Sequence, residues 1–337
     1  MDWFEKLFGF REGHYEATRQ RLVVEGSTLR SLVNGRSFGV GKLELASLQS
    51  LRERVRDGGG LPGRLRAKIV RGDVRPMHQA PEYAGALFQV ASQFNLLEML
   101  GPDVTPEQGV TRYLADKTQG PACAIAAAAA TVYRNYFAPV GEGIGQTHGR
   151  QLDGLADLGA ALRAALGRPA EPLWAMRNGY AMCTQAGLDA IGGHLSALGA
   201  DALDDLRGKL RIGVHRDVEV TDSDSIPPPV VSQAFCSALP VRYGGVPREH
   251  WQSFASLVLE AAYEATLLAA AENARRGASN VVLLTRLGGG AFGNDDDWIH
   301  AAIRRALELA AGFDLDVRLV SYGVPSSTTS ELIRRFQ

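Results

Sequence analysis

The segment of residues 280–294, NVVLLTRLGGGAFGN, constrains the fold of this chain more than any other. It begins with an apolar, β-branched run at residues 281–284, which is typical of a strand buried on both faces of a parallel sheet. Gly288, Gly289 and Gly290 follow, and because glycine has no Cβ, the backbone there can adopt positive φ and bring its N–H groups against a ligand. The segment predicts an α/β fold with an anion-binding loop, although a tight strand-to-helix turn would also use glycine.

The residues after the glycines predict a helix with an acidic first turn. Phe292 could stack on a sugar or a base, and Asn294 could cap a helix over residues 295–311. Asp295, Asp296 and Asp297 would then lie in the first turn, where negative charge suits the helix dipole, with metal binding or catalysis as the alternative. Because these carboxylates would repel an anion on the helix axis, we expect a bound phosphate on the glycine loop itself.

Length and charge allow one large domain and give no strong signal for nucleic acid. The 337 residues are enough to bury a substantial core. The net charge of -1 argues against general affinity for nucleic acid, but residues 52–75 are locally basic and leave a nucleic-acid partner open. A solvated helix face would also explain these basic residues, which are Arg52, Arg54, Arg56, Arg64, Arg66, Lys68, Arg71 and Arg75.

Cysteine usage and the N-terminal sequence indicate a reducing, cytoplasmic setting. Cys123, Cys183 and Cys236 are far apart in apolar sequence, which fits neither a disulfide framework nor a zinc site. The start, MDWFEKLFGF, lacks the basic region and continuous apolar region of a signal peptide. The most apolar stretch, residues 122–132, is shorter than the roughly 20 residues of a membrane span, so we expect no membrane insertion.

The pattern of elements predicts a three-layer α/β/α core with a mixed, mostly parallel sheet. We expect residues 1–80 to form an N-terminal elaboration and residues 81–337 to form the core, with an insertion at about 140–209. If the strands that end near Val90, Leu284 and Val320 are parallel neighbours, the loops after them share one rim, where ligands bind in such sheets. Strands are expected at residues 86–91, 210–220, 230–240, 281–284 and 317–322, and helices at 48–56, 121–133, 151–166, 185–198 and 251–275.

The C-terminal third resembles the macrodomain superfamily, and within it the poly(ADP-ribose) glycohydrolase branch. The resemblance lies in a long Ala/Leu-rich helix, the sequence LTRLGGGAFGND, a further helix, and RLVSYGVPSSTTSEL. It implies a macrodomain-like fold whose glycine loop binds the diphosphate of ADP-ribose while the aromatic residue packs on the distal ribose. The positions that would carry these contacts are Gly288, Gly289, Gly290, Ala291, Phe292 and Gly293, with Asn294 and Tyr322 adjoining them.

The first half of the family site is matched in part. The sequence VASQFNLLE would place Asn95 near the ribose, with Gln93 and Phe94 beside it as further ligand contacts. The glycohydrolase branch carries a glycine triplet followed by Gln-Glu-Glu. This chain instead has Gln119, a further candidate contact, followed by glycine and proline in DKTQGPACA. The departure bears on the activity rather than on the binding fold.

Two carboxyl groups are candidates for the chemistry that the resemblance implies. Cleavage of an O-glycosidic bond at an anomeric carbon needs an acid for the leaving oxygen and a water placed for attack. Glu98 is the first candidate, because in a helical turn it would share a face with Asn95, and Asp116 is the second. A salt bridge or exposed acid for Glu98, and a turn or helix cap for Asp116, remain the structural alternatives.

The sequence therefore predicts a protein that binds ADP-ribose or a related nucleotide and hydrolyses an ADP-ribosyl O-glycosidic linkage, with ADP-ribose or an ADP-ribosylated substrate as its partner. A non-catalytic ADP-ribose reader is the first alternative, because the paired glutamates are absent. A metal-dependent nucleotide phosphatase that uses Asp222, Asp224 and the acidic turn at residues 295–297 is the second. The histidines are scattered without metal-ligand spacing, and we expect no cofactor and no resident metal.

Overall fold

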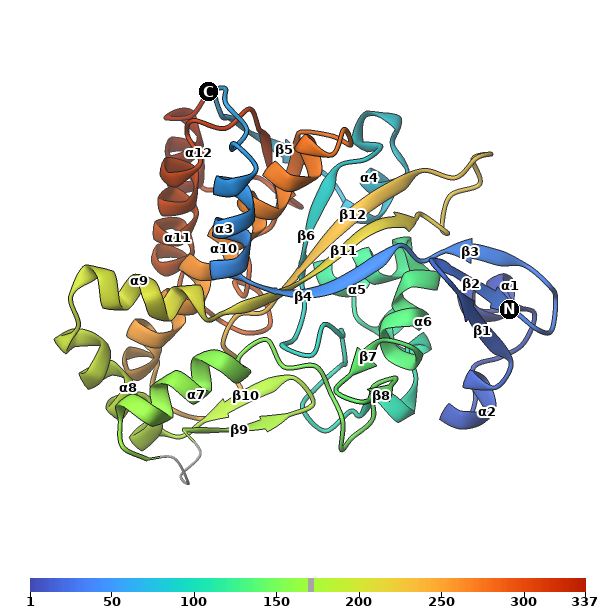
Figure 1. Ribbon diagram of the computed structural model, residues 1–337, viewed down its shortest axis with the longest axis horizontal. Coiled ribbons are helices and arrows are strands. Elements are labelled where there is room, and N and C mark those ends of the chain that lie inside the picture. Colours follow the sequence, from blue (N-terminus) through green and yellow to red (C-terminus); the bar gives the residue numbers. More distant parts are fainter. Residues whose placement is uncertain (169–172) are drawn as a thin grey trace.

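The computed structural model describes residues 1–168 and 173–337, which are arranged around one seven-stranded sheet (Figure 1). Its strands are β4 (Lys42–Ser47), β5 (Arg66–Arg71), β6 (Leu87–Ala91), β11 (Arg211–Glu219), β12 (Val230–Cys236), β13 (Val281–Leu284) and β14 (Asp316–Ser321). The spatial order is β4-β11-β12-β6-β13-β14-β5. All neighbours from β12 to β5 are parallel, whereas β11 is antiparallel to β4 and to β12. The expected mixed, mostly parallel sheet is confirmed.

Helices cover both faces of this sheet, as the three-layer expectation requires (Figure 1). One face carries α3 (Leu48–Asp57), α8 (Gln185–Ala197), α9 (Ala200–Gly208), α10 (Gln252–Arg275), α11 (Asp296–Leu309) and α12 (Ser327–Arg334). The other carries α4 (Val74–Gln79), α5 (Gln119–Ala126) and α6 (Ala128–Tyr136). Strand β13 is buried throughout: Val282 and Leu284 pack toward α10, and Val281 and Leu283 pack toward the opposite layer.

Helix α10 is the centre of its layer and packs against α3, α8 and α11. Its alanine-rich sequence allows close approach of these neighbours from several sides. Among the described residues, the helical segment Arg248–Arg275 is the one that is long and apolar enough to cross a membrane, but 89% of its apolar window is buried inside the protein. Because so much of this segment is buried, its apolar composition is that of a core helix.

The N-terminal elaboration is smaller than the sequence suggested. It consists of α1 (Trp3–Phe8), α2 (Tyr15–Arg19), β1 (Leu22–Glu25), β2 (Thr28–Ser31) and β3 (Ser37–Gly39), which form their own apolar cluster against α6. Strands β4 and β5, which precede the boundary expected at residue 80, are both part of the central sheet. The basic segment Arg66–Arg71 alternates in side-chain direction as edge strand β5 and is not a helix face.

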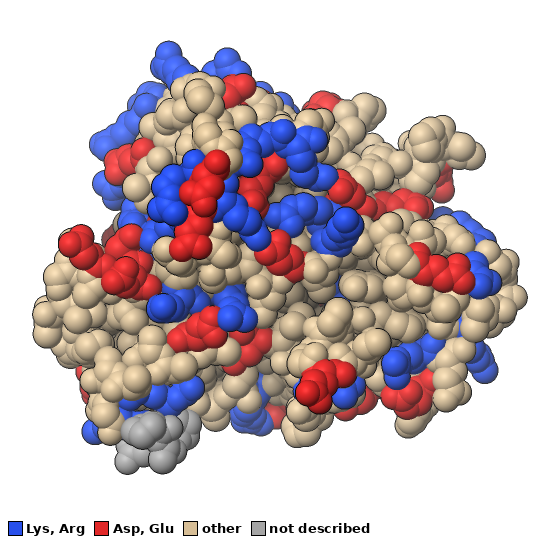
Figure 2. All heavy atoms as spheres, in the orientation of Figure 1, with Lys and Arg blue, Asp and Glu red and all other residues tan. Residues whose placement is uncertain are grey.

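Four of the eight basic side chains expected on one face, those of Arg52, Arg54, Arg56 and Arg75, are paired with acids. Arg52 donates to Asp204 and to Glu264, and Arg54 donates to Glu44. Figure 2 shows Lys and Arg interspersed with Asp and Glu on the visible face, without a continuous basic surface there. Ion pairs therefore offset part of the local excess of positive charge, and those of Arg52 and Arg54 join α3 to other elements.

The insertion forms two small hairpins and a helix before α8 and α9. These are β7 (Pro139–Val140), β8 (Gly143–Ile144), α7 (Ala156–Ala165), β9 (Trp174–Arg177) and β10 (Tyr180–Cys183). The segment LWAMRNGYAM turns back on itself as the β9–β10 hairpin because Asn178 and Gly179 both adopt positive φ. Short 3-10 helices complete the connections: η1 (Pro81–Tyr83), η2 (Pro106–Gln108), η3 (Thr111–Ala115) and η4 (Arg248–Trp251).

Strands β6, β13 and β14 are adjacent and parallel, so the loops that follow them lie on the same edge of the sheet. This arrangement was expected from the sequence and is confirmed. It brings the segment after Ala91, the glycine loop after Leu284 and the segment after Ser321 together at one rim.

Candidate functional site

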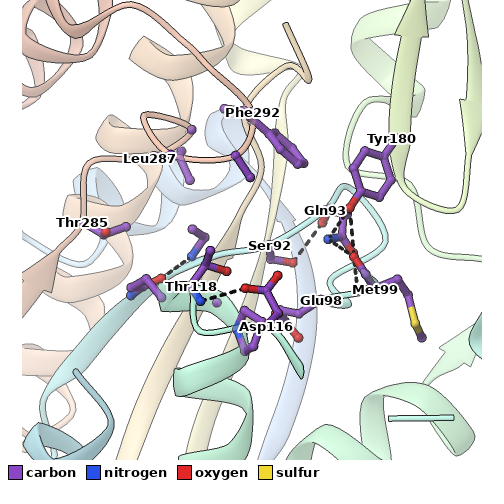
Figure 3. Close-up of a pocket in the computed structure, with 18 of the residues that line it drawn as sticks. Ser92, Gln93, Glu98, Met99, Asp116, Thr118, Tyr180, Thr285, Leu287 and Phe292 are labelled. Atoms are coloured by element: carbon purple, nitrogen blue, oxygen red, sulfur yellow. Dashed lines mark hydrogen bonds between the residues drawn. The ribbon is translucent and has the colours of Figure 1, made fainter. Parts of the chain in front are cut away.

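A cavity opens on this rim between the loops after β6 and β13 (Figure 3). It has a volume of about 140 Å³ and adjoins a second hollow of about 560 Å³ toward the ends of β14 and β5. The two share the residues Asp116, Thr118, Gln119, Thr285, Arg286 and Gly290. Together they form one elongated cleft, a shape that suits an extended ligand rather than a compact one.

The glycine loop is pinned at its start by α10. The hydroxyl of the buried Tyr263 donates to the carbonyl of Thr285 (2.7 Å) and accepts from the amide of Leu287 (2.8 Å). Gly288 adopts a φ of 73°, and a Cβ there would lie 2.4 Å from the Cβ of Ala238. Glycine is therefore required at position 288 by both conformation and space.

Three consecutive amides of this loop are free to bind a ligand. No residue that the structure describes accepts a hydrogen bond from the N–H groups of Gly290, Ala291 or Phe292, and all three residues line the cavity. Arg286 lines it as well and forms an ion pair with Asp296. Free amides beside a guanidinium provide the donors and the charge that bind a phosphate or diphosphate.

The other residues of the loop face away from this cavity. Gly289, Gly293 and Asn294 line a separate hollow, where Gly293 packs against the side chain of Arg242. The amide of Asn294 donates to the carbonyl of Leu239 at 2.8 Å and is buried. Asn294 is thus not the helix cap that the sequence suggested.

The cap of α11 is instead the next residue. Asp295 is the N-cap, and its carboxylate accepts from the amide of Asp297. A carboxylate in this position satisfies a free N–H group and the positive end of the helix dipole at once. The acidic turn therefore has a local structural role.

Glu98 lies at the bottom of the cavity, on the side opposite Phe292 (Figure 3). Only 2% of the residue is exposed, and neither carboxyl oxygen has a hydrogen-bond partner among the described residues. Burial raises the pKa of Glu98 to about 8, against the opposing effect of the nearby Arg134 guanidinium. Glu98 is therefore a protonated carboxylic acid near neutral pH whose polar atoms remain available to a ligand.

Gly120, the residue after Gln119, has no room for a side chain beside Glu98. A Cβ on Gly120 would lie 1.9 Å from the carbonyl oxygen of Ala91 and 3.0 Å from Cγ of Glu98. No side chain can therefore occupy position 120 without moving the end of β6. The side chain of Glu98 thus lies directly beside the start of α5.

Asp116 and Gln119 line the same cavity, but their side chains also make local bonds. The Asp116 carboxylate accepts from the amide of Thr118 at 2.8 Å, in the turn before α5. The Gln119 side chain accepts from the amide of Ala91 and donates to the carbonyl of Gln89, both at 2.8 Å. It therefore fixes the start of α5 to the end of β6, and Asp116 is half-buried beside Glu98.

The loop between β6 and Glu98 is not the helical turn that would place Asn95 and Glu98 on one face. Leu96 adopts a φ of 64°, and the side-chain oxygen Oδ1 of Asn95 accepts from the backbone amide of Leu97 within the loop. Asn95 is fully buried and, like Phe94, lies outside the cavity lining. Both residues support the loop, which leaves Glu98 as the member of this segment that presents a free polar group.

Gln93 reaches the cavity but is already hydrogen-bonded. Its amide nitrogen donates to the carbonyl of Met99 and to the hydroxyl of Tyr180, and its amide oxygen accepts from the amide of Met99 (Figure 3). The Tyr180 hydroxyl donates to the same Met99 carbonyl at 2.9 Å. This network holds the residue next to Glu98 in place.

An aromatic wall closes the cavity opposite Glu98. The ring of Tyr180, from the β9–β10 hairpin, lies 5.2 Å from that of Phe292 and 5.2 Å from that of Tyr243. All three residues line the cavity. Tyr322, by contrast, is 85% exposed and lines only the adjoining 560 Å³ hollow.

Several lining residues were not identified from the sequence. Arg286 could have been, because it lies within the glycine segment, but Tyr180 and Tyr243 come from segments that carry no recognisable motif. The lining residues that sequence reasoning missed are Ala91, Ser92, Met99, Leu100, Thr118, Gly120, Pro121, Tyr180, Ala238, Tyr243, Thr285, Arg286 and Leu287.

The acidic residues considered for metal binding lie in separate places. Asp222 accepts from Arg75 Nε at 2.6 Å, and Asp224 lies 3.9 Å from the ammonium group of Lys6. Asp295 caps α11. Within residues 1–168 and 173–337, no three His, Cys, Asp or Glu side chains converge in the manner of metal ligands.

Comparison with known proteins gives structural likeness only. No family model and no curated protein matches the chain. A solved poly(ADP-ribose) glycohydrolase from Deinococcus radiodurans in complex with ADP-ribose is similar over 97% of both chains, with 15% identity and a TM-score of 0.44. The enzyme of the same name from Thermomonospora curvata is similar over 96% of both chains, with 14% identity and a TM-score of 0.43. These proteins bear the name of the branch that the C-terminal third resembles, and the identity is too low to match individual residues.

Proposed function

We propose that this protein binds ADP-ribose and hydrolyses an O-glycosidic bond at its distal ribose. The observation that carries the proposal is the buried carboxyl of Glu98, which has no hydrogen-bond partner among the described residues and faces, across one cavity, three loop amides that donate to none of them. An acid and an anion-binding loop in the same cleft are the two parts that hydrolysis of a nucleotide sugar requires.

The dimensions of the cleft suit the parts of this ligand. The diphosphate would accept from the amides of Gly290, Ala291 and Phe292, with the guanidinium of Arg286 beside it. The distal ribose would lie between the ring of Phe292 and the carboxyl of Glu98. The adenosine would then extend into the adjoining hollow of about 560 Å³, which Tyr322 lines.

The reaction would use Glu98 first as an acid and then as a base. Its carboxyl proton passes to the leaving oxygen as the bond between that oxygen and the anomeric carbon breaks. The bound diphosphate stabilises the positive charge that develops on the ribose. Water then adds to the anomeric carbon and returns its proton to the Glu98 carboxylate, so that the acid is restored. Asp116, which lines the same cavity, is the second candidate for the acid.

A non-catalytic reader of ADP-ribose is the runner-up. One observation favours it: position 120 is a glycine with no room for a side chain, and Pro121 follows, so the start of α5 carries no carboxyl group. A reader would use the same loop and the same aromatic wall, and the two functions differ in turnover rather than in binding.

Binding is tested by titration calorimetry with ADP-ribose. Gly290→Glu places a carboxylate in open space within the cleft, where it should repel the diphosphate. Gly312→Glu is the matched control, because Gly312 is also in open space and has no part in the cleft. We expect binding by the wild type and the Gly312 variant and a loss of at least about tenfold in affinity for Gly290→Glu. No binding by the wild type would contradict the proposal.

Turnover is tested with an O-linked ADP-ribosyl substrate. We expect Glu98→Gln to bind ADP-ribose as the wild type does and to lose about 10²-fold or more of the hydrolysis rate, since general acid catalysis contributes that much. A wild type that binds but releases no ADP-ribose would establish the reader instead.

A further inference from the structure

A cation lies buried behind the proposed acid. Arg134, on α6, has no exposed surface, and its guanidinium carbon lies 3.8 Å from the centre of the Phe235 ring. Burial of a charged side chain costs free energy unless neighbouring groups stabilise the charge. The contacts of this guanidinium therefore indicate the role of the buried charge.

The contacts of Arg134 converge on the loop that carries Glu98. Its Nε donates to the carbonyl of Leu96 at 3.1 Å, and its Nη2 donates to the hydroxyl of Thr131 at 3.0 Å. Nη2 also lies 3.7 Å from a carboxyl oxygen of Glu98. Nη1 has no hydrogen-bond partner among the described residues. One side chain thus fixes the backbone two residues before Glu98 and faces its carboxyl group.

The spacing differs from that of a structural salt bridge. A charge-assisted hydrogen bond between a guanidinium and a carboxylate has a typical length of about 2.7–2.9 Å. At 3.7 Å the two groups attract each other without a hydrogen bond, and neither carboxyl oxygen of Glu98 has a hydrogen-bond partner in the part of the chain that the structure describes. The arrangement leaves the carboxyl proton and lone pairs to a ligand while a positive charge remains near.

The other groups that face Glu98 cannot replace this charge. The hydroxyl of Tyr113, on η3, accepts from the amide of Glu98 at 3.1 Å. Burial raises the pKa of Tyr113 and of Cys123, on α5, so both face Glu98 as neutral groups. The hydroxyl of Ser92 and the carboxylate of Asp116 complete the surroundings. Among the described residues that influence Glu98, Arg134 is the one cation.

We propose that Arg134 is a positioning residue that holds the Glu98 loop and stabilises the carboxylate formed when Glu98 gives its proton to the leaving oxygen. This inference rests on the proposed function. Burial keeps the acid protonated before the reaction, and the guanidinium lowers the free energy of the carboxylate that the proton transfer produces. The same carboxylate then takes a proton from the attacking water, and Arg134 itself gives up no proton.

The test compares Arg134→Met with Gln146→Met. Gln146 is fully buried and donates to the carbonyl of Asn95 in the same loop and to the backbone carbonyl of Arg134, so its loss removes support from both segments without removing a charge. The titration of the Glu98 carboxyl is followed by NMR in protein labelled with ¹³C at the glutamate carboxyl, with Glu98→Gln used to assign its signal. We expect the midpoint to rise by about 1–3 pH units in Arg134→Met and to stay unchanged in Gln146→Met.

An unmoved midpoint in Arg134→Met, or an equal movement in both variants, would overturn the proposal. Arg134→Lys keeps the charge and loses the bond from Nε, so its midpoint should remain near the wild-type value. If the methionine variant does not fold, a rise of a full unit or more in the lysine variant would count against the role of the charge, and an unchanged midpoint would support it.

The kinetic consequence separates this inference from the proposed function. In the wild-type background Arg134→Met should lower kcat while the affinity for ADP-ribose is kept, and in a Glu98→Gln background it should have no further effect. Additive effects of the two substitutions would contradict action through Glu98. A wild type without turnover would remove the proposed reaction, whereas the NMR titration would still decide whether Arg134 controls the ionisation of Glu98.

Discussion

At the scale of single residues, Glu98 combines burial with a titratable group, and this combination has a cost that depends on pH. Its pKa is raised from 4.5 to about 8, so the folded state holds a proton that the unfolded state has lost between these two values. Stability from this group is complete below pH 4.5 and falls as the pH rises toward 8. Above that range the folded protein carries the full cost of a buried carboxylate.

Glu98→Gln should remove this cost, because an amide stays neutral at every pH. We expect the melting temperature of the variant, relative to the wild type, to be higher at pH 9 than at pH 5 by at least about 2 °C. Burial lowers the pKa of His78 to about 4 and that of His215 to about 3, so both reduce the stability of the folded protein as the pH falls below 6.5. This effect is the same in the wild type and in the variant. A difference in melting temperature that is constant with pH would show that Glu98 is not buried as a neutral acid.

At the scale of elements, Gly288 and Gly290 have different roles in the glycine loop. Gly288 has a positive φ and a neighbour at 2.4 Å, whereas a Cβ on Gly290 would meet nothing within 4 Å. The first glycine shapes the loop, and the second keeps its ligand side open.

Alanine substitutions should separate these roles. We expect Gly288→Ala to lower the free energy of unfolding by about 1–3 kcal/mol through backbone strain and overlap with Ala238. Gly290→Ala should change it by no more than about 0.5 kcal/mol. Urea unfolding of both variants measures the difference, and equal destabilisation would mean that the loop conformation differs from that described.

At the scale of the whole molecule, the N-terminal elements are joined to the region around Glu98. The carboxylate of Glu12 accepts from the amides of Val110 (2.8 Å) and Thr111 (2.7 Å) and from the hydroxyl of Tyr136 (2.8 Å). Val110 and Thr111 lie at the start of η3, and the hydroxyl of Tyr113 in η3 accepts a hydrogen bond from the amide of Glu98. The elaboration therefore supports the floor of the cleft from outside the sheet.

Glu12→Ala leaves these partly buried donors without an acceptor. We expect it to lower the free energy of unfolding by about 1–3 kcal/mol while unfolding remains a single transition, because the N-terminal cluster packs directly on α6. Denaturant unfolding followed by both fluorescence and circular dichroism measures this. Two separated transitions would indicate that the elaboration is an independent unit.

Sequence reasoning was most accurate where one continuous segment carries the signal. The buried strand at residues 281–284, the glycine loop and the long helix before it are written in local patterns of apolar and glycine residues, and all three are present in the structure. It was least accurate where a segment has a mixed pattern. Strand β5 is basic on its exposed side and was not distinguished from a helix face, and α12 was not expected.

The sequence by itself determined the fold class, the loop that lines the cleft and the presence of an acidic residue in the segment after β6. Only the tertiary structure decided that Glu98 is buried beside Arg134, that Tyr180 from the insertion faces Phe292, and that Asn95 supports the loop instead of lining the cavity. Periodicity reports which side of one element is apolar, whereas the partner of a buried charge or ring comes from a distant segment. That partner is set by the packing of the whole chain around the sheet.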